Sequence, residues 1–190
     1  MAGELKPDSI LIAEFEYIAQ SAFQVSEDRA KVSSFYLITV GSFFAAILGV
    51  NIYTTTTEDV YRGFAFLFLV LSLNSLITLG KLVQLRLAWL DSVRAMNAIK
   101  ECYLQQFGKE IESAFLWRKM PGKFRRNSIS FMLALEVALL GAITCGTGVM
   151  FFGLSYGQQL WGIAIVGGLI YLAIQIWLYR YGLRETQTDS

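Results

Sequence analysis

The chain has 190 residues and a net charge of +1; 55% of its residues are hydrophobic and 16% are charged. Soluble domains carry about 25% charged residues, so this composition disfavours a soluble globular protein. The near-zero net charge gives no bulk attraction to nucleic acid. The chain has no histidine, which removes the commonest metal ligand and general base. We therefore expect an all-α, multi-pass membrane protein that is not an enzyme and holds no metal or other cofactor.

Residues 1–32 form the first expected element, an amphipathic helix on the cytoplasmic side. Pro7 and the Asp8–Ser9 pair are typical of a helix start. Apolar residues then recur at helical spacing: Leu11, Phe15, Ile18, Ala22 and Val25. A helix lying flat on the membrane is the alternative. The acidic residues of this segment disfavour it, because the inner leaflet surface is anionic.

Four apolar runs are long enough to cross a bilayer, which needs about 20 helical residues. They cover residues 33–52, 63–81, 128–154 and 160–179, and they leave 53–62 and 155–159 as outer loops. Of the 16 basic residues, 15 lie outside those two loops. Basic residues favour the cytoplasmic flanks of spans, so we expect both termini, including the tail 180–190, on the cytoplasmic side of the cell (inner) membrane. Four aromatic residues fit an inner interfacial belt: Phe35, Tyr36, Trp177 and Tyr179.

Residues 82–127 are expected to be a cytoplasmic helical stalk that ends in a basic elbow. No proline interrupts residues 60–120, so the second span should continue as one helix that packs antiparallel on residues 1–32. Its heptad pattern puts Leu82, Trp89, Met96 and Tyr103 at one seam position and Leu85, Ser92, Ile99 and Gln106 at the other. Glu14 should lie near Arg94 and Lys100. Pro121–Gly122 then breaks the helix.

The basic elbow around that break is expected to contact anionic lipid headgroups. The residues that we assign to this contact are Lys119, Lys123, Arg125 and Arg126. A specific lipid or ligand site at the elbow is the alternative.

Glu136 is an ionisable residue inside the third apolar run. Counted from the basic inner flank of each span, it lies at a depth similar to that of three other polar residues, Asn74, Thr39 and Tyr171, so the four side chains could form one layer. A lipid-facing carboxylate is costly, so Glu136 should point into the bundle or a wet cavity. Two interpretations remain open. Protonated Glu136 donates a hydrogen bond to Asn74 or a backbone carbonyl, or it is a proton- or ion-responsive group beside a path.

Small residues at four-residue spacing let helix backbones approach closely in lipid. Such series are Gly41, Ala45 and Gly49 in the first span and Ala134, Ala138, Ala142 and Gly146 in the third, and Ala164 and Gly168 form a pair in the fourth. We expect these residues to be helix-packing surfaces, within one chain or between chains. Cys102 and Cys145 lie in different kinds of segment and should not form a disulfide.

Two stretches, AFQVSEDRAKVSSFYLITVGSF and NSISFMLALEVALLG, resemble a family of small bacterial four-helix integral membrane proteins with no assigned activity. The resemblance implies a four-helix membrane fold and carries no catalytic residue. More loosely, the layout is similar to small helical membrane effectors of bacterial nucleotide-signalled defence. We expect a non-enzymatic membrane protein that acts as a homo-oligomeric scaffold or pore-forming unit. The alternatives are an ion channel or proton-coupled transporter that uses Glu136, and an accessory subunit of a larger membrane complex.

Overall fold

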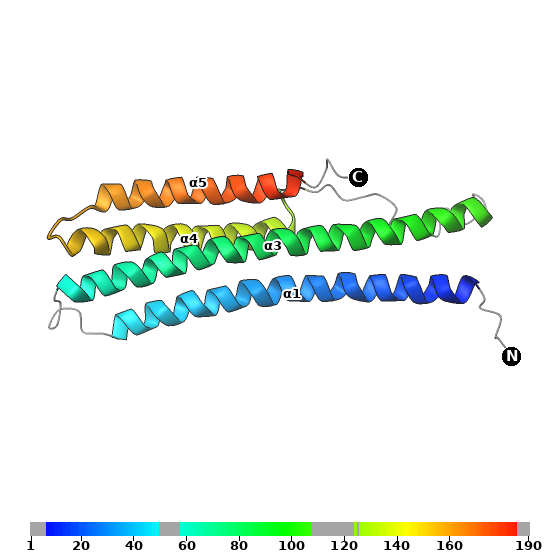
Figure 1. Cartoon of the computed structure of the whole chain (residues 1–190), viewed down its shortest axis with the longest axis horizontal. Helices are drawn as coiled ribbons and strands as arrows, with labels where there is room; N and C mark the ends of the chain where they lie inside the picture. The colour runs from blue at the N-terminus through cyan, green and yellow to red at the C-terminus, as the bar shows by residue number, and fades with distance from the viewer. Residues whose placement is uncertain (1–6, 50–57, 108–123, 125, 186–190) are drawn as a thin grey trace. The chain divides into compact units, whose positions relative to one another are not determined.

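The computed structural model describes residues 7–49, 58–107, 124 and 126–185, and these residues form an all-helical fold. The four helices are α1 (Pro7–Gly49), α3 (Glu58–Phe107), α4 (Ile129–Leu154) and α5 (Trp161–Glu185) (Figure 1). By length and composition, all four are long and apolar enough to cross a membrane. The expected all-α fold with four candidate membrane helices is therefore confirmed.

Local signals set the ends of these helices. Pro7 is the first residue of α1, a position where the missing N–H costs nothing. Ser128 caps α4, because its Oγ accepts a hydrogen bond of 3.3 Å from the Phe131 amide. After Leu154 the chain reverses through a turn in which Gly157 has a φ of +70°, a conformation that favours glycine. No proline lies inside α3, which is one uninterrupted helix of 50 residues.

The chain divides into two compact units. The two-helix unit comprises residues 1–29 and 84–123, and the four-helix unit comprises residues 30–83 and 124–190. Both α1 and α3 contribute to both units.

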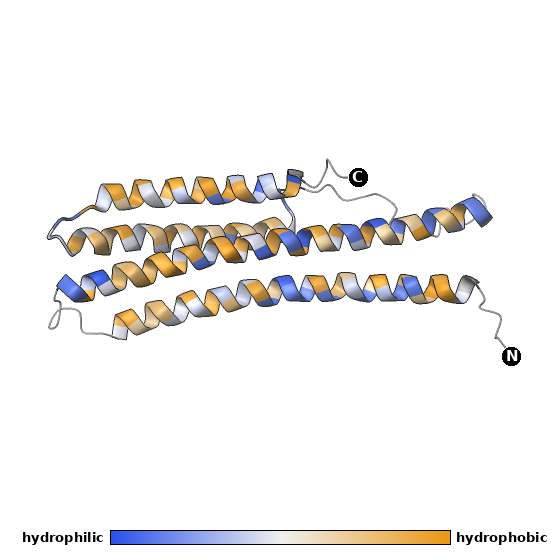
Figure 2. Ribbon diagram, in the orientation of Figure 1, coloured by the Kyte–Doolittle hydropathy of each residue, from blue (hydrophilic) through white to orange (hydrophobic). Residues whose placement is uncertain are grey.

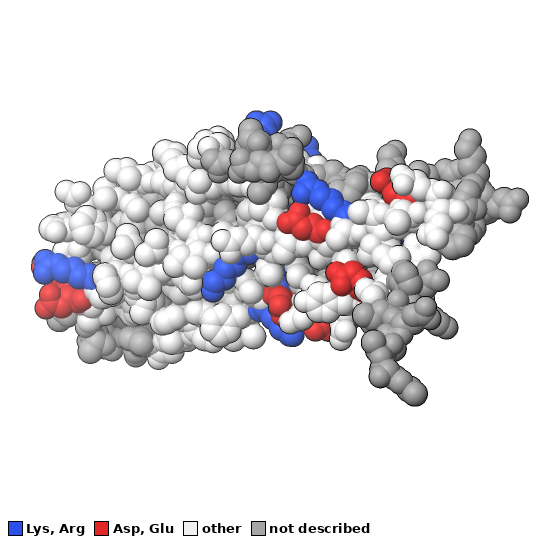
Figure 3. All heavy atoms as spheres, turned by 45° about the vertical axis from the view of Figure 1, so that its right-hand side comes forward, with Lys and Arg blue, Asp and Glu red and all other residues white. Residues whose placement is uncertain are grey.

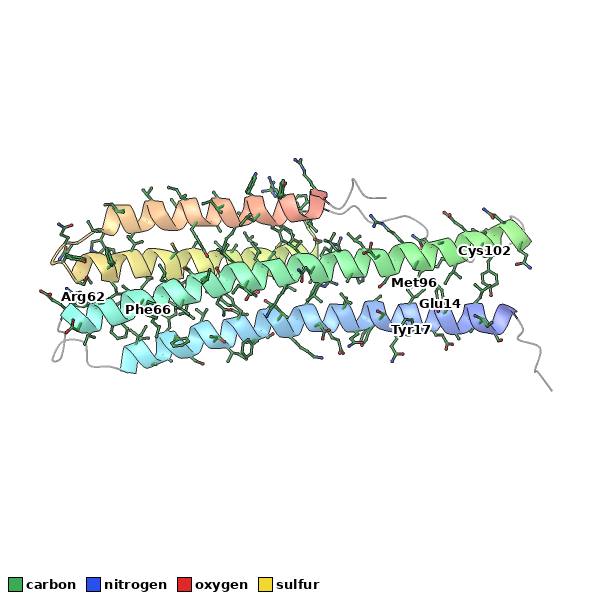
Figure 4. All side chains as sticks on the ribbon, in the orientation of Figure 1. Glu14, Tyr17, Arg62, Phe66, Met96 and Cys102 are labelled. Carbon is green, nitrogen blue, oxygen red and sulfur yellow. The ribbon has the colours of Figure 1, made fainter. Side chains whose placement is uncertain are left out.

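In the two-helix unit, the described parts of α1 and α3 pack antiparallel. Arg29 lies over the ring of Trp89 at 5.9 Å, and Lys100 lies over the ring of Phe15, also at 5.9 Å. Among the labelled side chains of this unit, Glu14 and Tyr17 lie on α1 and Met96 and Cys102 lie on α3 (Figure 4). A residue near the start of α1 therefore faces a residue near the end of α3, which is the antiparallel packing expected for these two segments.

The buried face of α3 in this unit is rotated from the expected heptad seam. The most buried residues are Arg86, Leu90 and Asn97, whereas Gln106 is exposed. The Arg86 guanidinium lies 4.7 Å from the Trp89 ring centre, so an arginine stem can occupy an inward position while its charged head meets an aromatic face. The sequence predicts that Glu14 lies near Arg94 and Lys100. Arg94 bonds Asp91 of its own helix at 2.8 Å.

The four-helix unit has an aromatic cluster where α1, α3 and α4 meet. Phe68 stacks on Phe151 at 5.7 Å and lies 5.5 Å from Phe44, and Phe64 lies 5.3 Å from Phe151. Lipid tails are as apolar as these rings, so close packing rather than water exclusion holds such helices together. The outward face of α5 instead carries bulky apolar residues: Ile163, Ile165, Val166, Leu169 and Ile170. In Figure 2 the α5 ribbon is mostly orange, with paler bands between the orange ones.

Apart from Glu136, the described charged side chains of the four-helix unit lie at its two ends. At one end Arg62 bonds Glu58 and Asp59, each at 3.4 Å. The other end carries exposed basic residues only among its described side chains: Lys31, Lys81, Arg126, Arg180 and Arg184. On the face drawn in Figure 3, a wide surface without charged side chains adjoins a small charged group at one end. An uncharged surface of this kind is what lipid chains require.

Candidate functional site

A cluster of polar side chains joins α3 to α5 inside the apolar four-helix unit. Ser75 Oγ donates to the Ser72 carbonyl at 2.6 Å, and it accepts a hydrogen bond of 2.5 Å from Gln175 Nε2. The Tyr171 hydroxyl donates to the Ser72 carbonyl at 2.5 Å and lies 3.2 Å from Ser75 Oγ. Ser75 and Gln175 are completely buried. We call these four residues, Ser72, Ser75, Tyr171 and Gln175, the polar cluster.

Helix α4 contacts the polar cluster through Gly141. A Cβ at this position would lie 2.2 Å from Ser75 Oγ and 2.8 Å from Gln175 Nε2, so glycine is required for this close approach. One turn further, the fully buried Thr144 donates to the Gly141 carbonyl at 2.9 Å. The hydroxyl of buried Tyr36 on α1 faces Ser75 and Thr144 but does not reach hydrogen-bond geometry with either. All four helices therefore meet at the polar cluster.

The chemistry of the polar cluster is that of neutral hydrogen bonds. It contains hydroxyls and one amide, with no carboxylate, ammonium or guanidinium among its members. One acceptor, Gln175 Oε1, is buried without a hydrogen-bond partner. In hydrocarbon, hydrogen bonds between helices contribute about 0.6 kcal/mol on average and up to about 1.7. The arrangement can fix the register of α5 on α3, and it offers no acid–base pair for catalysis.

Glu136 lies on the outward side of α4 and not at the polar cluster. Its side chain is partly exposed, and it shares its side of the helix with Met132 and Ile143, which are 55% and 54% exposed. The adjacent residue Val137 is completely buried. Within the described parts of the chain, Glu136 makes no hydrogen bond or ion pair, and the expected bond to Asn74 is not formed.

The other residues of the expected layer have separate surroundings. Tyr171 belongs to the polar cluster. Thr39 is partly exposed and donates to the Phe35 carbonyl of its own helix at 2.8 Å. Asn74 is also partly exposed, and its backbone carbonyl accepts from Thr78 Oγ1 at 2.8 Å. No hydrogen bond links Glu136, Asn74, Thr39 and Tyr171 to one another in the described structure.

The small residues of α4 lie at two contacts. Ala134 and Ala138 are buried. Gly146 meets α5, where a Cβ would lie 2.9 Å from the Ala164 carbonyl oxygen. Across the same contact, a Cβ on Gly168 would lie 2.9 Å from the Ala142 carbonyl oxygen. The backbones of α4 and α5 thus touch directly, as small residues at this spacing permit.

The small residues of α1 face outward. Gly41, Ala45 and Gly49 are all exposed, and a Cβ built on either glycine would meet nothing within 4 Å. Two further small residues, Ser42 and Ala46, are exposed beside them. We call Gly41, Ser42, Ala45, Ala46 and Gly49 the small face of α1. It has no partner among the described residues of the chain.

Of the basic elbow, Lys119, Lys123 and Arg125 lie outside the described residues, and Arg126 is exposed. Among the described residues, no group of three or more histidine, cysteine, aspartate or glutamate side chains could hold a metal ion. Both cysteines are free, Cys102 on the surface and Cys145 partly buried.

Sequence reasoning missed Ser72, Ser75 and Gln175. The available signal was spacing: Tyr171 and Gln175 stand one helical turn apart, as Ser72 and Ser75 nearly do, so each pair shares a helix face. Two polar pairs on two apolar helices are a recognisable pattern for an interhelical hydrogen-bond site.

No family model, curated protein or solved structure matches this chain. Its function is therefore inferred from its own residues.

Proposed function

We propose that this protein is a non-enzymatic, multi-pass protein of the cell (inner) membrane that acts as a homo-oligomeric scaffold or pore-forming unit, with both termini cytoplasmic. The observation that carries the proposal is the small face of α1, where Gly41, Ala45 and Gly49 are exposed with open space above both glycines. Small residues in series let a second helix approach to backbone contact in lipid.

The contrast with α5 supports an interface on α1. Outward residues of α5 are large and apolar, such as Ile165 and Leu169, which are 62% and 60% exposed. Side chains of this kind suit contact with lipid chains. The small face of α1 consists of short side chains and includes the hydroxyl residue Ser42, with the bulky residues Ile38 and Leu48 exposed beside it. A helix from another copy fits this surface better than lipid does.

Glu136 gives independent support. A carboxyl group on the outward side of a membrane helix is costly against lipid, and within the described chain it has no hydrogen-bond partner. Contact with a neighbouring copy would remove Glu136 from the lipid. The same residue also favours the second candidate function, an ion channel or proton-coupled transporter in which Glu136 is the titratable group.

The oligomer is tested by replacing a glycine of the small face. Gly41→Leu should shift the protein from oligomer to monomer in native mass spectrometry from mild detergent, because leucine blocks backbone contact. Gly167→Leu on α5 is the matched control, since Gly167 also has nothing within 4 Å of its Cβ. A wild-type protein that is monomeric at all concentrations would overturn the proposal. Co-purification of such a monomer with a different protein would instead identify an accessory subunit.

The channel or transporter alternative is tested in liposomes. Reconstituted wild-type protein should conduct ions or protons, and Glu136→Gln should change the flux. Absence of flux in the wild type, or flux unaffected by the substitution, removes this alternative.

A further inference from the structure

One corner of the four-helix unit holds an arginine in place with an aromatic ring. The Arg180 guanidinium lies 5.1 Å from the centre of the Phe124 ring. Phe124 meets Phe131 of α4 edge to face at 5.4 Å, and Phe131 lies 6.1 Å from Tyr179. This chain of rings fixes Phe124 against α4 and α5. Arg180 itself stays exposed, so its charge is positioned and available to a ligand.

The positive charge at this corner is not balanced by described acidic residues. Arg126 and Arg184 are also exposed, and none of these three arginines makes an ion pair within the described chain. Between Phe124 and the end of α5 the sequence has two carboxylates against four arginines: Glu136 and the terminal residue Glu185. The first of these, Glu136, is far from the three exposed arginines in depth. It lies about 10 Å along α4 from the helix start at 1.5 Å per residue. An anion is therefore the ligand class that complements this corner.

Exposed aromatic residues place the same corner at a membrane boundary. Trp177 and Tyr181, one turn apart on α5, stack at 5.3 Å and are 59% and 46% exposed. Trp and Tyr are enriched at the level of lipid headgroups. Of the four residues expected to form the inner belt, Tyr36 and Tyr179 are instead buried in the core.

From this combination we propose that Arg180, Arg184 and Arg126 bind the phosphate group of an anionic phospholipid, with Trp177 and Tyr181 at headgroup level beside it. Guanidinium groups bind phosphate oxygens with two parallel hydrogen bonds. The site rests on the membrane location in the proposed function and does not require the oligomer.

The test is competition between two lipids with the same acyl chains, phosphatidylglycerol and phosphatidylcholine, offered in equal amounts to delipidated full-length protein. Native mass spectrometry should show preferential binding of phosphatidylglycerol. Arg180→Gln and Arg184→Gln should each lower the preference by about fivefold. Phe124→Leu should lower it as well, although it removes no charge, because it frees the Arg180 side chain. Arg62→Gln is the control at the opposite end, where Arg62 already bonds Glu58 and Asp59, and it should keep the wild-type preference.

Three results would overturn the site. They are equal binding of the two lipids by the wild type, an unchanged preference in Arg180→Gln/Arg184→Gln, and displacement of the lipid by inorganic phosphate at millimolar concentration, which would make free phosphate the ligand. Sedimentation of the wild-type protein with membranes is measured in parallel. If the protein sediments without showing the lipid preference, the site fails while the membrane proposal stands; if it stays in the supernatant, the membrane proposal itself fails.

Discussion

Gln175 Nε2 donates a hydrogen bond of 2.5 Å to Ser75 Oγ, which joins α5 to α3 inside the four-helix unit. The two partners are not equivalent. Ser75 also donates to the Ser72 carbonyl, whereas the second polar atom of Gln175, Oε1, is buried without a partner. Replacing Ser75 should therefore change the free energy of unfolding by a different amount from replacing Gln175.

Ser75→Ala should destabilise the protein more than Gln175→Leu. Alanine at 75 leaves the whole Gln175 amide buried without a partner, at a cost of about 1–3 kcal/mol. Leucine at 175 removes the bond but also removes the orphan Oε1, so the unfolding free energy should change by less than about 1 kcal/mol. Unfolding titrations from mild detergent into dodecyl sulfate measure the free energy of unfolding of both variants.

The double variant completes the comparison. Ser75→Ala combined with Gln175→Leu should be no less stable than Ser75→Ala alone, because no amide is then left unpaired. Strictly additive losses would show that the two side chains do not depend on each other.

Gly141→Ala should destabilise the protein by about 1–3 kcal/mol, the usual cost of overpacking. The new Cβ would lie 2.2 Å from Ser75 Oγ and 2.7 Å from Ser75 Cβ, so fully buried Ser75 or the α4 backbone must shift. The thermal midpoint in detergent gives the measurement. Gly162→Ala is the comparison, since its Cβ meets nothing within 4 Å. Similar midpoints for the two variants would contradict the tight approach of α4.

Neighbouring glycines on α5 should respond in opposite ways. Gly168→Ala places a Cβ 2.9 Å from the Ala142 carbonyl oxygen, so α4 and α5 must separate and stability must fall. Gly167→Ala enters open space and should be neutral or stabilising, because alanine favours a helix by about 0.5–1 kcal/mol over glycine. The thermal unfolding midpoints of the two variants, measured in the same detergent, test this difference. Equal losses at both positions would exclude direct backbone contact as the cause.

A membrane-impermeant maleimide should show which side of the membrane each cysteine lies on. The basic residues favour a cytoplasmic location for Cys102, which is exposed and should react only after cells are permeabilised. In a Cys102→Ser background, Gln158→Cys in the loop between α4 and α5 should react in intact cells, because Gln158 is exposed. Labelling of Cys102 in intact cells would contradict the proposed orientation and place residue 102 outside the cytoplasm.

The helices were predictable because lipid imposes a simple rule: a spanning segment must be helical, apolar and about 20 residues long. The continuity of α3 followed from the absence of proline between residues 60 and 120. The contact surface of α4 with α5 could also be anticipated, since Gly146 stands in a series of small residues and two backbones can meet only where side chains are small.

The composition of the interior site could not be predicted in the same way. Counting residues from a basic flank gives the depth of Glu136, Asn74 and Tyr171 but not the direction in which each side chain points. Each step along a helix turns that direction by about 100°. Tyr171 points to α3, and Glu136 points outward. The same spacing of small residues makes helix contacts on α4 and is exposed on α1, since spacing alone does not identify the neighbour.

The direct contact of α4 with α5 has a consequence for biosynthesis. A short turn joins the two helices, and their backbones meet at Gly146 and Gly168, so residues 124–185 can partition from the translocon into the bilayer as a preassembled hairpin. A gene split within the segment that precedes Phe124 should therefore still yield an assembled four-helix unit when both fragments are synthesised in the same cell.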